Sequence, residues 1–137
     1  MQIGQKIPRF KLSNQNGEVI DSEKLLGKNI VLYFYPKDNT PGCTIEGKEF
    51  TQLKSAFDKK NTIVFGISKQ GVESHQRFCK TYNFTIDLLA DTEGKLHEAL
   101  GITNRSTLLA DEHGTIKKIW THVTPRGHAA SVLQSIA

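Results

Sequence analysis

The chain has 137 residues, of which 37% are hydrophobic and 23% are charged, and its formal net charge is +4. A chain of this length can bury roughly two-thirds of its unfolded surface, so residues 1–137 are expected to form a single domain. The lysines and arginines are scattered, which predicts a solvated surface and no nucleic-acid partner. No apolar stretch reaches the ~20 residues of a membrane span, and the first six residues lack the apolar core of a signal peptide. A cytoplasmic protein with no membrane partner is therefore expected.

The N-terminal part of the chain predicts a hairpin, a helical turn and a buried strand. Residues 10–12 and 18–20 flank Asn16-Gly17, which is typical of a two-residue β-turn. Residues 22–26 predict one helical turn that Gly27 would end. The apolar block at 30–35 is short and rich in β-branched and aromatic residues, which favours a strand buried on both faces.

The remaining elements alternate between helix and strand. Apolar residues at helical spacing after residue 40 predict one helix that runs to about Lys59. The elements expected after it are a strand at 62–68, a helix at 72–82, a strand at 86–90, a short helix at 94–100, a hairpin of 106–110 with 115–120, and a last helix at 128–136. This order predicts an α/β fold with a mixed central sheet flanked by helices. Such sheets usually place their chemistry at the carboxyl ends of strands.

The stretch from Pro36 to Cys43 joins the strand at 30–35 to the following helix. Thr40 followed by Pro41 is a helix-start signal, with the Thr40 hydroxyl as N-cap and Pro41 in the first helical position. Cys43 then lies in the first turn, near unpaired backbone N–H groups and the positive end of the helix dipole. That environment favours the thiolate, the nucleophilic form of cysteine. The alternative is a small buried hydrophobic residue, but the position predicts a reactive sulfur.

Residues 34–44, with the sequence FYPKDNTPGCT, and Glu46 after them resemble the active-site signature of the peroxiredoxins. The fuller string is similar to the bacterioferritin comigratory protein subfamily, also called peroxiredoxin Q, and the similarity continues at residues 105–107 and 111–114. The resemblance implies a thioredoxin-like fold with an N-terminal β-hairpin extension. It also implies a thiol peroxidase that reduces hydrogen peroxide and organic hydroperoxides without a metal or organic cofactor.

The resemblance assigns a role to each residue of the signature. Cys43 would be the peroxidatic nucleophile, Thr40 would hydrogen-bond the sulfur and the bound peroxide, and Pro36 would shield the site. Spacing alone does not choose among the chain's arginines, and the family pattern selects Arg105 as the group that stabilises the thiolate and the departing oxygen. Glu46 would orient Arg105. Each residue also has a purely structural alternative. Thr40 could be only a helix cap and Pro36 only a strand end. Arg105 could be a surface arginine, and Glu46 could be an acidic residue that favours the first helical turn.

Cys79 decides the subtype. Many relatives carry a second cysteine five positions after the first, where this chain has Lys48, whereas another branch places it on the next long helix, as Cys79 is here. The resemblance thus implies an intramolecular disulfide between Cys43 and Cys79, recycled by thioredoxin or a similar dithiol. A disulfide needs Cα atoms within roughly 7 Å, so one or both helices are expected to unwind, which Gly47 would ease.

Other readings of the cysteines remain open. If Cys79 is a structural core residue, the protein is a one-Cys peroxidase or a peroxide-sensing redox module. His75 and Cys79 lie four residues apart, with Cys43 as a conceivable third metal ligand. Structural zinc needs four ligands at close spacings, and no such cluster occurs, so no metal site is predicted. Neither a P-loop nor a dinucleotide fingerprint is present. Many relatives of this branch are monomers, and a monomer is expected.

Overall fold

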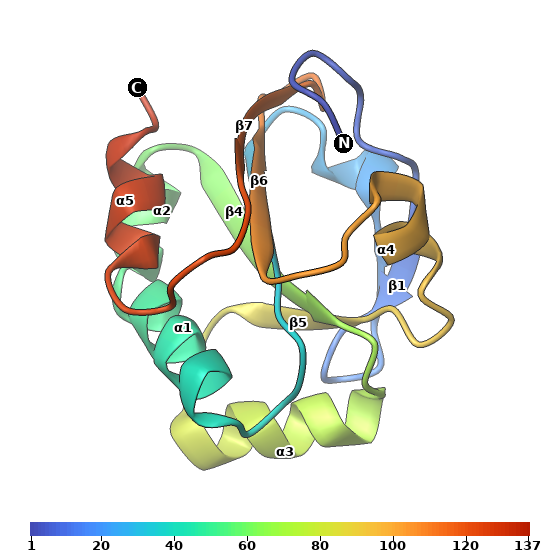
Figure 1. The fold of residues 1–137 in the computed structure, drawn as a ribbon, viewed down its shortest axis with the longest axis vertical. Helices are drawn as coiled ribbons and strands as arrows, with labels where there is room; N and C mark the ends of the chain where they lie inside the picture. The colour runs from blue at the N-terminus through green and yellow to red at the C-terminus, as the bar shows by residue number, and fades with distance from the viewer.

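A seven-stranded mixed sheet runs through the molecule in the order β2-β1-β5-β4-β3-β6-β7 (Figure 1). The computed structural model describes all of residues 1–137. In chain order the elements are β1 (Lys11–Ser13), β2 (Val19–Asp21), the 3₁₀ helix η1 (Ser22–Leu25), β3 (Asn29–Phe34), α1 (Pro41–Gln52), α2 (Lys54–Lys59), β4 (Thr62–Ser68), α3 (Val72–Tyr82), β5 (Asp87–Ala90), α4 (Lys95–Leu100), β6 (Ser106–Ala110), β7 (Ile116–Trp120) and α5 (His128–Gln134). The α/β architecture predicted from the alternation of elements is confirmed.

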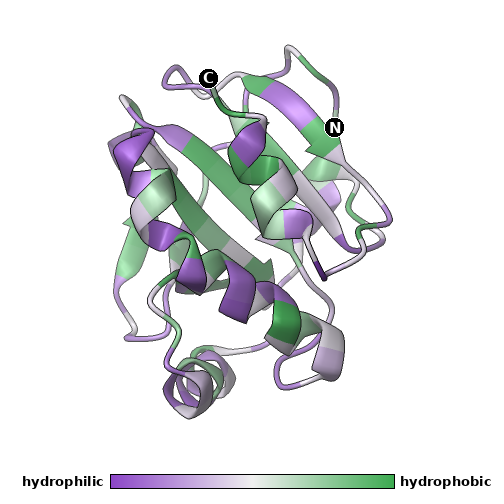
Figure 2. Ribbon diagram, turned by 90° about the vertical axis from the view of Figure 1, so that its left-hand side faces the viewer, coloured by the Kyte–Doolittle hydropathy of each residue, from purple (hydrophilic) through white to green (hydrophobic).

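Strand β3 lies inside the sheet, parallel to β4 and antiparallel to β6. Because its side chains alternate between the faces, Val31 and Tyr33 enter one apolar core, and Ile30, Leu32 and Phe34 enter the other. Helices α1, α2, α3 and α5 contribute to the first core, and α4 with the N-terminal segment covers the second. In Figure 1, α1, α2 and α5 lie on the opposite side of the sheet from α4, and Figure 2 shows the apolar strands behind the helices. Burial on both faces explains the continuous apolar sequence of this strand.

Two local predictions were wrong. The helix after residue 40 does not run unbroken to Lys59, because Leu53 leaves helical geometry (ψ 5°) and separates α1 from α2. Phe50 and Phe57 still share one core, with ring centroids 5.8 Å apart, so the apolar spacing continues across the break and conceals it. The first hairpin has a five-residue loop, since Ser13 pairs with Val19.

The longer loop of that hairpin is organised by Asn14. Its side-chain oxygen accepts from the backbone N–H groups of Asn16 and Glu18, at 2.9 and 3.0 Å. Asparagine side chains commonly bond to backbone N–H groups two residues ahead in this way. The Asn16-Gly17 pair therefore lies within a wider turn, in which Gly17 adopts a positive φ of 78°.

Gly47 lies where α1 meets the ring of Phe84. A Cβ atom at this position would lie only 2.4 Å from Cζ of Phe84. The ring also packs against Phe78 of α3, with centroids 4.9 Å apart and the rings nearly perpendicular. Glycine is required here because the aromatic ring lies directly on the helix backbone.

We expect Gly47→Ala to destabilise the protein by about 1–3 kcal/mol through overpacking. Alanine is the better helix former by about 1 kcal/mol, so helix propensity alone predicts the opposite sign. Urea titration of the reduced protein measures the difference. The double variant Gly47→Ala/Phe84→Leu, which makes room for the methyl group, should recover part of the loss. A Gly47→Ala variant as stable as the parent would contradict the tight contact.

Candidate active site

Cys43 lies at the carboxyl end of β3, in the first turn of α1. The loop 35–40 makes the connection, and Pro41 occupies the first helical position, as predicted. The Cys43 side chain is almost completely buried, with 1% of its surface exposed. The sulfur therefore lies close to the unpaired N–H groups of a helix start, inside an apolar core.

Thr40 begins the helix, but its hydroxyl does not cap it. The residue has the extended backbone of an N-cap, and its side chain makes no bond to the helix N–H groups. Instead the hydroxyl donates to the carbonyl oxygen of Lys37 at 2.8 Å. The predicted hydroxyl cap is wrong because the loop carbonyl takes the hydroxyl proton. This bond fixes the side chain within the loop and leaves the oxygen lone pairs available as acceptors.

Arg105 contacts both Cys43 and Glu46. Its Nη2 donates to the sulfur of Cys43 at 3.3 Å, and its Nη1 donates to Oε1 of Glu46 at 2.7 Å. Arg105 immediately precedes β6, and the antiparallel register places Ser106 opposite Phe34, the last residue of β3. The register therefore brings the arginine beside the cysteine. The contacts that the family resemblance implied between these residues are present in the structure.

Glu46 is a buried acid with only one of its oxygens bonded. Its side chain is fully buried, and Oε2 has no hydrogen-bond partner. Burial raises the pKa of Glu46 to about 7 and outweighs the opposing attraction of Arg105. The Arg105 guanidinium thus lies between the sulfur of Cys43 and the carboxyl group of Glu46, whose ionisation is costly.

Gly42 and Pro36 complete the surroundings of the arginine. A Cβ on Gly42 would lie 3.2 Å from Nη2 of Arg105, so glycine leaves room for the guanidinium. The sequence interpretation gave Gly42 no role, although it belongs to the recognised string. Pro36 is exposed and lines a cavity of about 330 Å³. Arg105, His97 and Ile102 also line this cavity. This cavity adjoins the site on the α4 side of the sheet.

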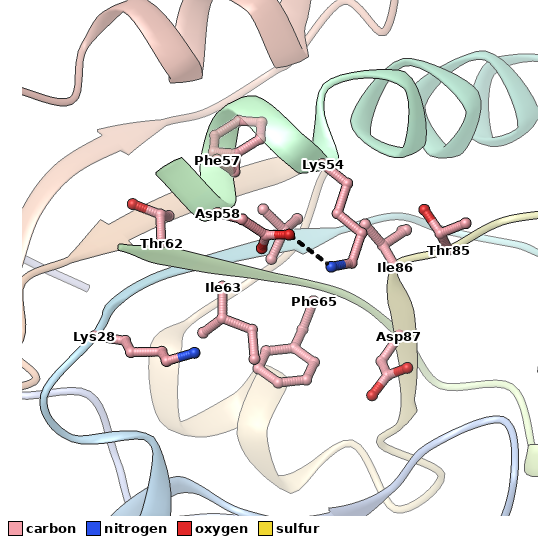
Figure 3. Close-up of a pocket in the computed structure, with 11 residues that line it drawn as sticks. Lys28, Lys54, Phe57, Asp58, Thr62, Ile63, Phe65, Thr85, Ile86 and Asp87 are labelled. Carbon is pink, nitrogen blue, oxygen red and sulfur yellow. Dashed lines mark hydrogen bonds and ion pairs between the residues drawn. The ribbon is translucent and has the colours of Figure 1, made fainter. Parts of the chain in front are cut away.

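Another cavity, of about 240 Å³, lies at the opposite end of the parallel strands (Figure 3). It is lined by α2 and by residues at the starts of β4 and β5, and the ion pair of Lys54 with Asp58 lies beside it. It contains none of the signature residues. The chemistry is therefore expected at the carboxyl ends of the strands, where Cys43 lies.

Asp38 and His75 form a buried pair that the sequence interpretation missed. Nδ1 of His75 lies 2.7 Å from Oδ2 of Asp38, and the hydroxyls of Tyr35 and Ser74 each donate to this carboxylate at 2.6 Å. Burial opposes ionisation of Asp38, but these hydrogen bonds outweigh it and lower the pKa of the acid. His75 thus binds the active-site loop through Asp38. No cluster of three or more His, Cys, Asp or Glu side chains is arranged to hold a metal ion.

Cys79 is buried on the inner face of α3. It belongs to the same apolar core as Cys43, and both cysteines are free thiols. Burial, together with the charges of Asp38 and Asp87, raises the pKa of Cys79 to about 12. In this position Cys79 is therefore a protonated thiol and a poor nucleophile.

Comparison with known proteins gives a consistent result. Residues 3–119 match the model of the AhpC/TSA family. The chain is 36% identical to peroxiredoxin Bcp of Bacillus subtilis over 99% of this chain and 95% of that one. The chain belongs to the AhpC/TSA family and is a peroxiredoxin. Its relatives identify it as a thiol peroxidase, an oxidoreductase.

Solved peroxiredoxin structures share the fold. The bacterioferritin comigratory protein of Xanthomonas campestris, in a study of its alkyl peroxide reduction, superposes with a TM-score of 0.91 at 32% identity, over 93% of this chain and 89% of that one. The thioredoxin-like fold is thereby confirmed. Two structures of Xanthomonas campestris peroxiredoxin Q, each with a TM-score of 0.90 at 33% identity over 92% of this chain and 88% of that one, carry one cysteine-to-serine substitution each. The two replaced cysteines are as many positions apart as Cys43 and Cys79.

The pKa of Glu46 predicts a specific pH dependence of stability. Because its folded-state pKa lies above the ordinary 4.5, the folded protein binds the extra proton, and this stabilisation is lost as the pH rises through about 7. Glu46→Gln does not titrate at this position. Relative to this variant, the free energy of unfolding of the parent should fall by up to roughly 3 kcal/mol between pH 4.5 and pH 8. Urea titrations of both proteins across this range measure the difference. Parallel pH profiles would contradict the raised pKa.

Proposed function

We propose that this peroxiredoxin uses Cys43 as its peroxidatic residue, with Arg105, Thr40, Pro36 and Glu46 as its active-site partners. The observation that carries the proposal is the 3.3 Å contact from Nη2 of Arg105 to the sulfur of Cys43. A guanidinium and a helix start together stabilise negative charge on that sulfur. Glu46 holds the guanidinium from its other side at 2.7 Å.

In the first step the Cys43 thiolate attacks one oxygen of hydrogen peroxide or an organic hydroperoxide. A sulfur–oxygen bond forms and the oxygen–oxygen bond breaks, so the sulfur is oxidised to a sulfenic acid and the peroxide is reduced. The departing hydroxide or alkoxide takes up a proton and leaves as water or alcohol. Arg105 stabilises the charge on this oxygen, and Thr40 accepts a hydrogen bond from the protonated oxygen of the peroxide.

In the second step the Cys79 thiol condenses with the Cys43 sulfenic acid. A disulfide forms and water is released. The common apolar core of the two cysteines and their spacing, which matches that of the two substituted cysteines in Xanthomonas campestris peroxiredoxin Q, support this pairing. A dithiol of the thioredoxin type then reduces the disulfide by thiol exchange and restores both thiols. We place this cycle in the cytoplasm, in a monomer.

Replacement of Arg105 tests the first step. Arg105→Gln should lower kcat/KM for hydrogen peroxide by about 10²-fold, because one preorganised cationic donor is removed from the developing charge. The matched control is Arg77→Gln, which changes an exposed arginine on α3. Peroxide consumption with an excess of dithiol measures both. Equal loss in the two variants would refute the assigned role of Arg105.

Replacement of each cysteine tests the cycle. Cys43→Ser should abolish peroxide turnover. After one equivalent of peroxide without reductant, the parent should lose two hydrogens by intact mass, and Cys79→Ser should gain one oxygen. If the parent gains oxygen on Cys43 while Cys79 stays free, the protein is a one-Cys peroxidase or a redox sensor. Multiple turnovers with thioredoxin then distinguish a peroxidase from a sensor.

A further inference from the structure

The two ends of α3 are attached to the peroxidatic loop in different ways. The peroxidatic loop, residues 35–40, carries Asp38, Asn39 and Thr40. Asp38 bonds to the first turn of α3, and Asn39 bonds to the last turn. Cys79 lies between these attachments, one helical turn after His75.

The first-turn attachment is buried and charged. Nδ1 of His75 faces the Asp38 carboxylate at 2.7 Å, and its Nε2 faces the backbone carbonyl of Leu89 at 3.1 Å. Nε2 also lies 3.4 Å from the hydroxyl of Ser68, so both ring nitrogens have partners inside the fold. His75 is fully buried, and Asp38 is also held by Ser74 and Tyr35. Separation of His75 from Asp38 would leave the buried Asp38 carboxylate without its ring partner, which is strongly unfavourable.

The last-turn attachment is exposed and neutral. Tyr82 donates from its hydroxyl to Oδ1 of Asn39 at 2.7 Å, in contact with solvent. The helix ends at Asn83, which adopts the left-handed conformation with φ 56°, an arrangement that costs energy in any residue with a side chain. The carbonyl of Cys79 accepts from the N–H groups of both Asn83 and Phe84. The backbone of Cys79 is thus part of the helix end itself.

We propose that α3 unwinds from its C-terminal end when Cys43 is oxidised, and that His75, paired with Asp38, is the positioning residue that keeps its first turn fixed. The proposal rests on the proposed Cys43–Cys79 disulfide. Loss of the cap at Asn83 frees Cys79 while the first turn and the peroxidatic loop stay together.

This direction of unwinding suits the chemistry of both cysteines. Exposure of Cys79 removes the burial that raises its pKa to about 12, and the thiol regains nucleophilic character as it approaches Cys43. Thr40 follows Asp38 by two residues, so the loop that carries it remains anchored throughout. The reaction with peroxide and the resolution of the sulfenic acid therefore depend on different ends of one helix.

Two substitutions at Asn83 form a matched test, because the residue lies outside the peroxidatic site. Asn83→Ala disfavours the left-handed cap and should speed disulfide formation about five-fold, whereas Asn83→Gly favours the cap and should slow it two- to five-fold. Acid quench and intact mass after a peroxide pulse follow the sulfenic acid and the disulfide separately. The rate of sulfenic acid formation should be unchanged in both variants.

Amide hydrogen exchange of the oxidised parent tests the direction of unwinding. We expect residues 79–84 to lose protection and residues 73–76 to keep it. In His75→Leu, residues 73–76 should lose protection as well, and sulfenic acid should form more slowly. His75→Asn keeps a donor near the Nδ1 position, so it should restore much of the protection at residues 73–76 and much of the rate of sulfenic acid formation.

The outcomes separate the two proposals. Equal resolution rates in both Asn83 variants, or loss of protection at the first turn alone, would overturn the direction of unwinding while the disulfide still forms. If the oxidised parent contains no disulfide, the proposed two-cysteine cycle fails, and this inference fails with it.

Discussion

The antiparallel pairing of β3 with β6 is the constraint on which the site depends. It places Arg105 beside the first turn of α1, where the guanidinium reaches the sulfur of Cys43 and the carboxylate of Glu46. The guanidinium is therefore held from both sides, so in the proposed reaction it need not be reoriented. Gly42 permits this approach because it has no side chain in the way.

The same first turn carries an energetic conflict. Glu46 orients the arginine, yet its burial disfavours the charge that makes the ion pair strong, and one of its oxygens has no partner. Isolated buried ion pairs often contribute little net stability because desolvation offsets their attraction. The pair is better explained by the position it gives to Arg105 than by the stability that it gives to the fold.

The peroxidatic loop also links the two cysteines mechanically. Asp38 ties it to the buried start of α3, and Asn39 ties it to the exposed end. The aromatic contact of Phe84 with α1 over Gly47 lies just beyond that end. The proposed unwinding near Cys79 therefore requires no change at the buried attachment, because different residues hold the two ends of α3.

The sequence alone determined the alternation of strands and helices, the buried character of β3, and the position of Cys43 at a helix start, because each follows from local periodicity or from adjacent residues. The family string added the expectation for Arg105 and Glu46. Only the tertiary structure decided the partner of His75, the hydroxyl bond of Thr40 and the break at Leu53. The partner of His75 lies far away in sequence, the Thr40 hydroxyl bond depends on the path of the loop backbone, and the break at Leu53 leaves the apolar spacing intact. No local pattern encodes these features.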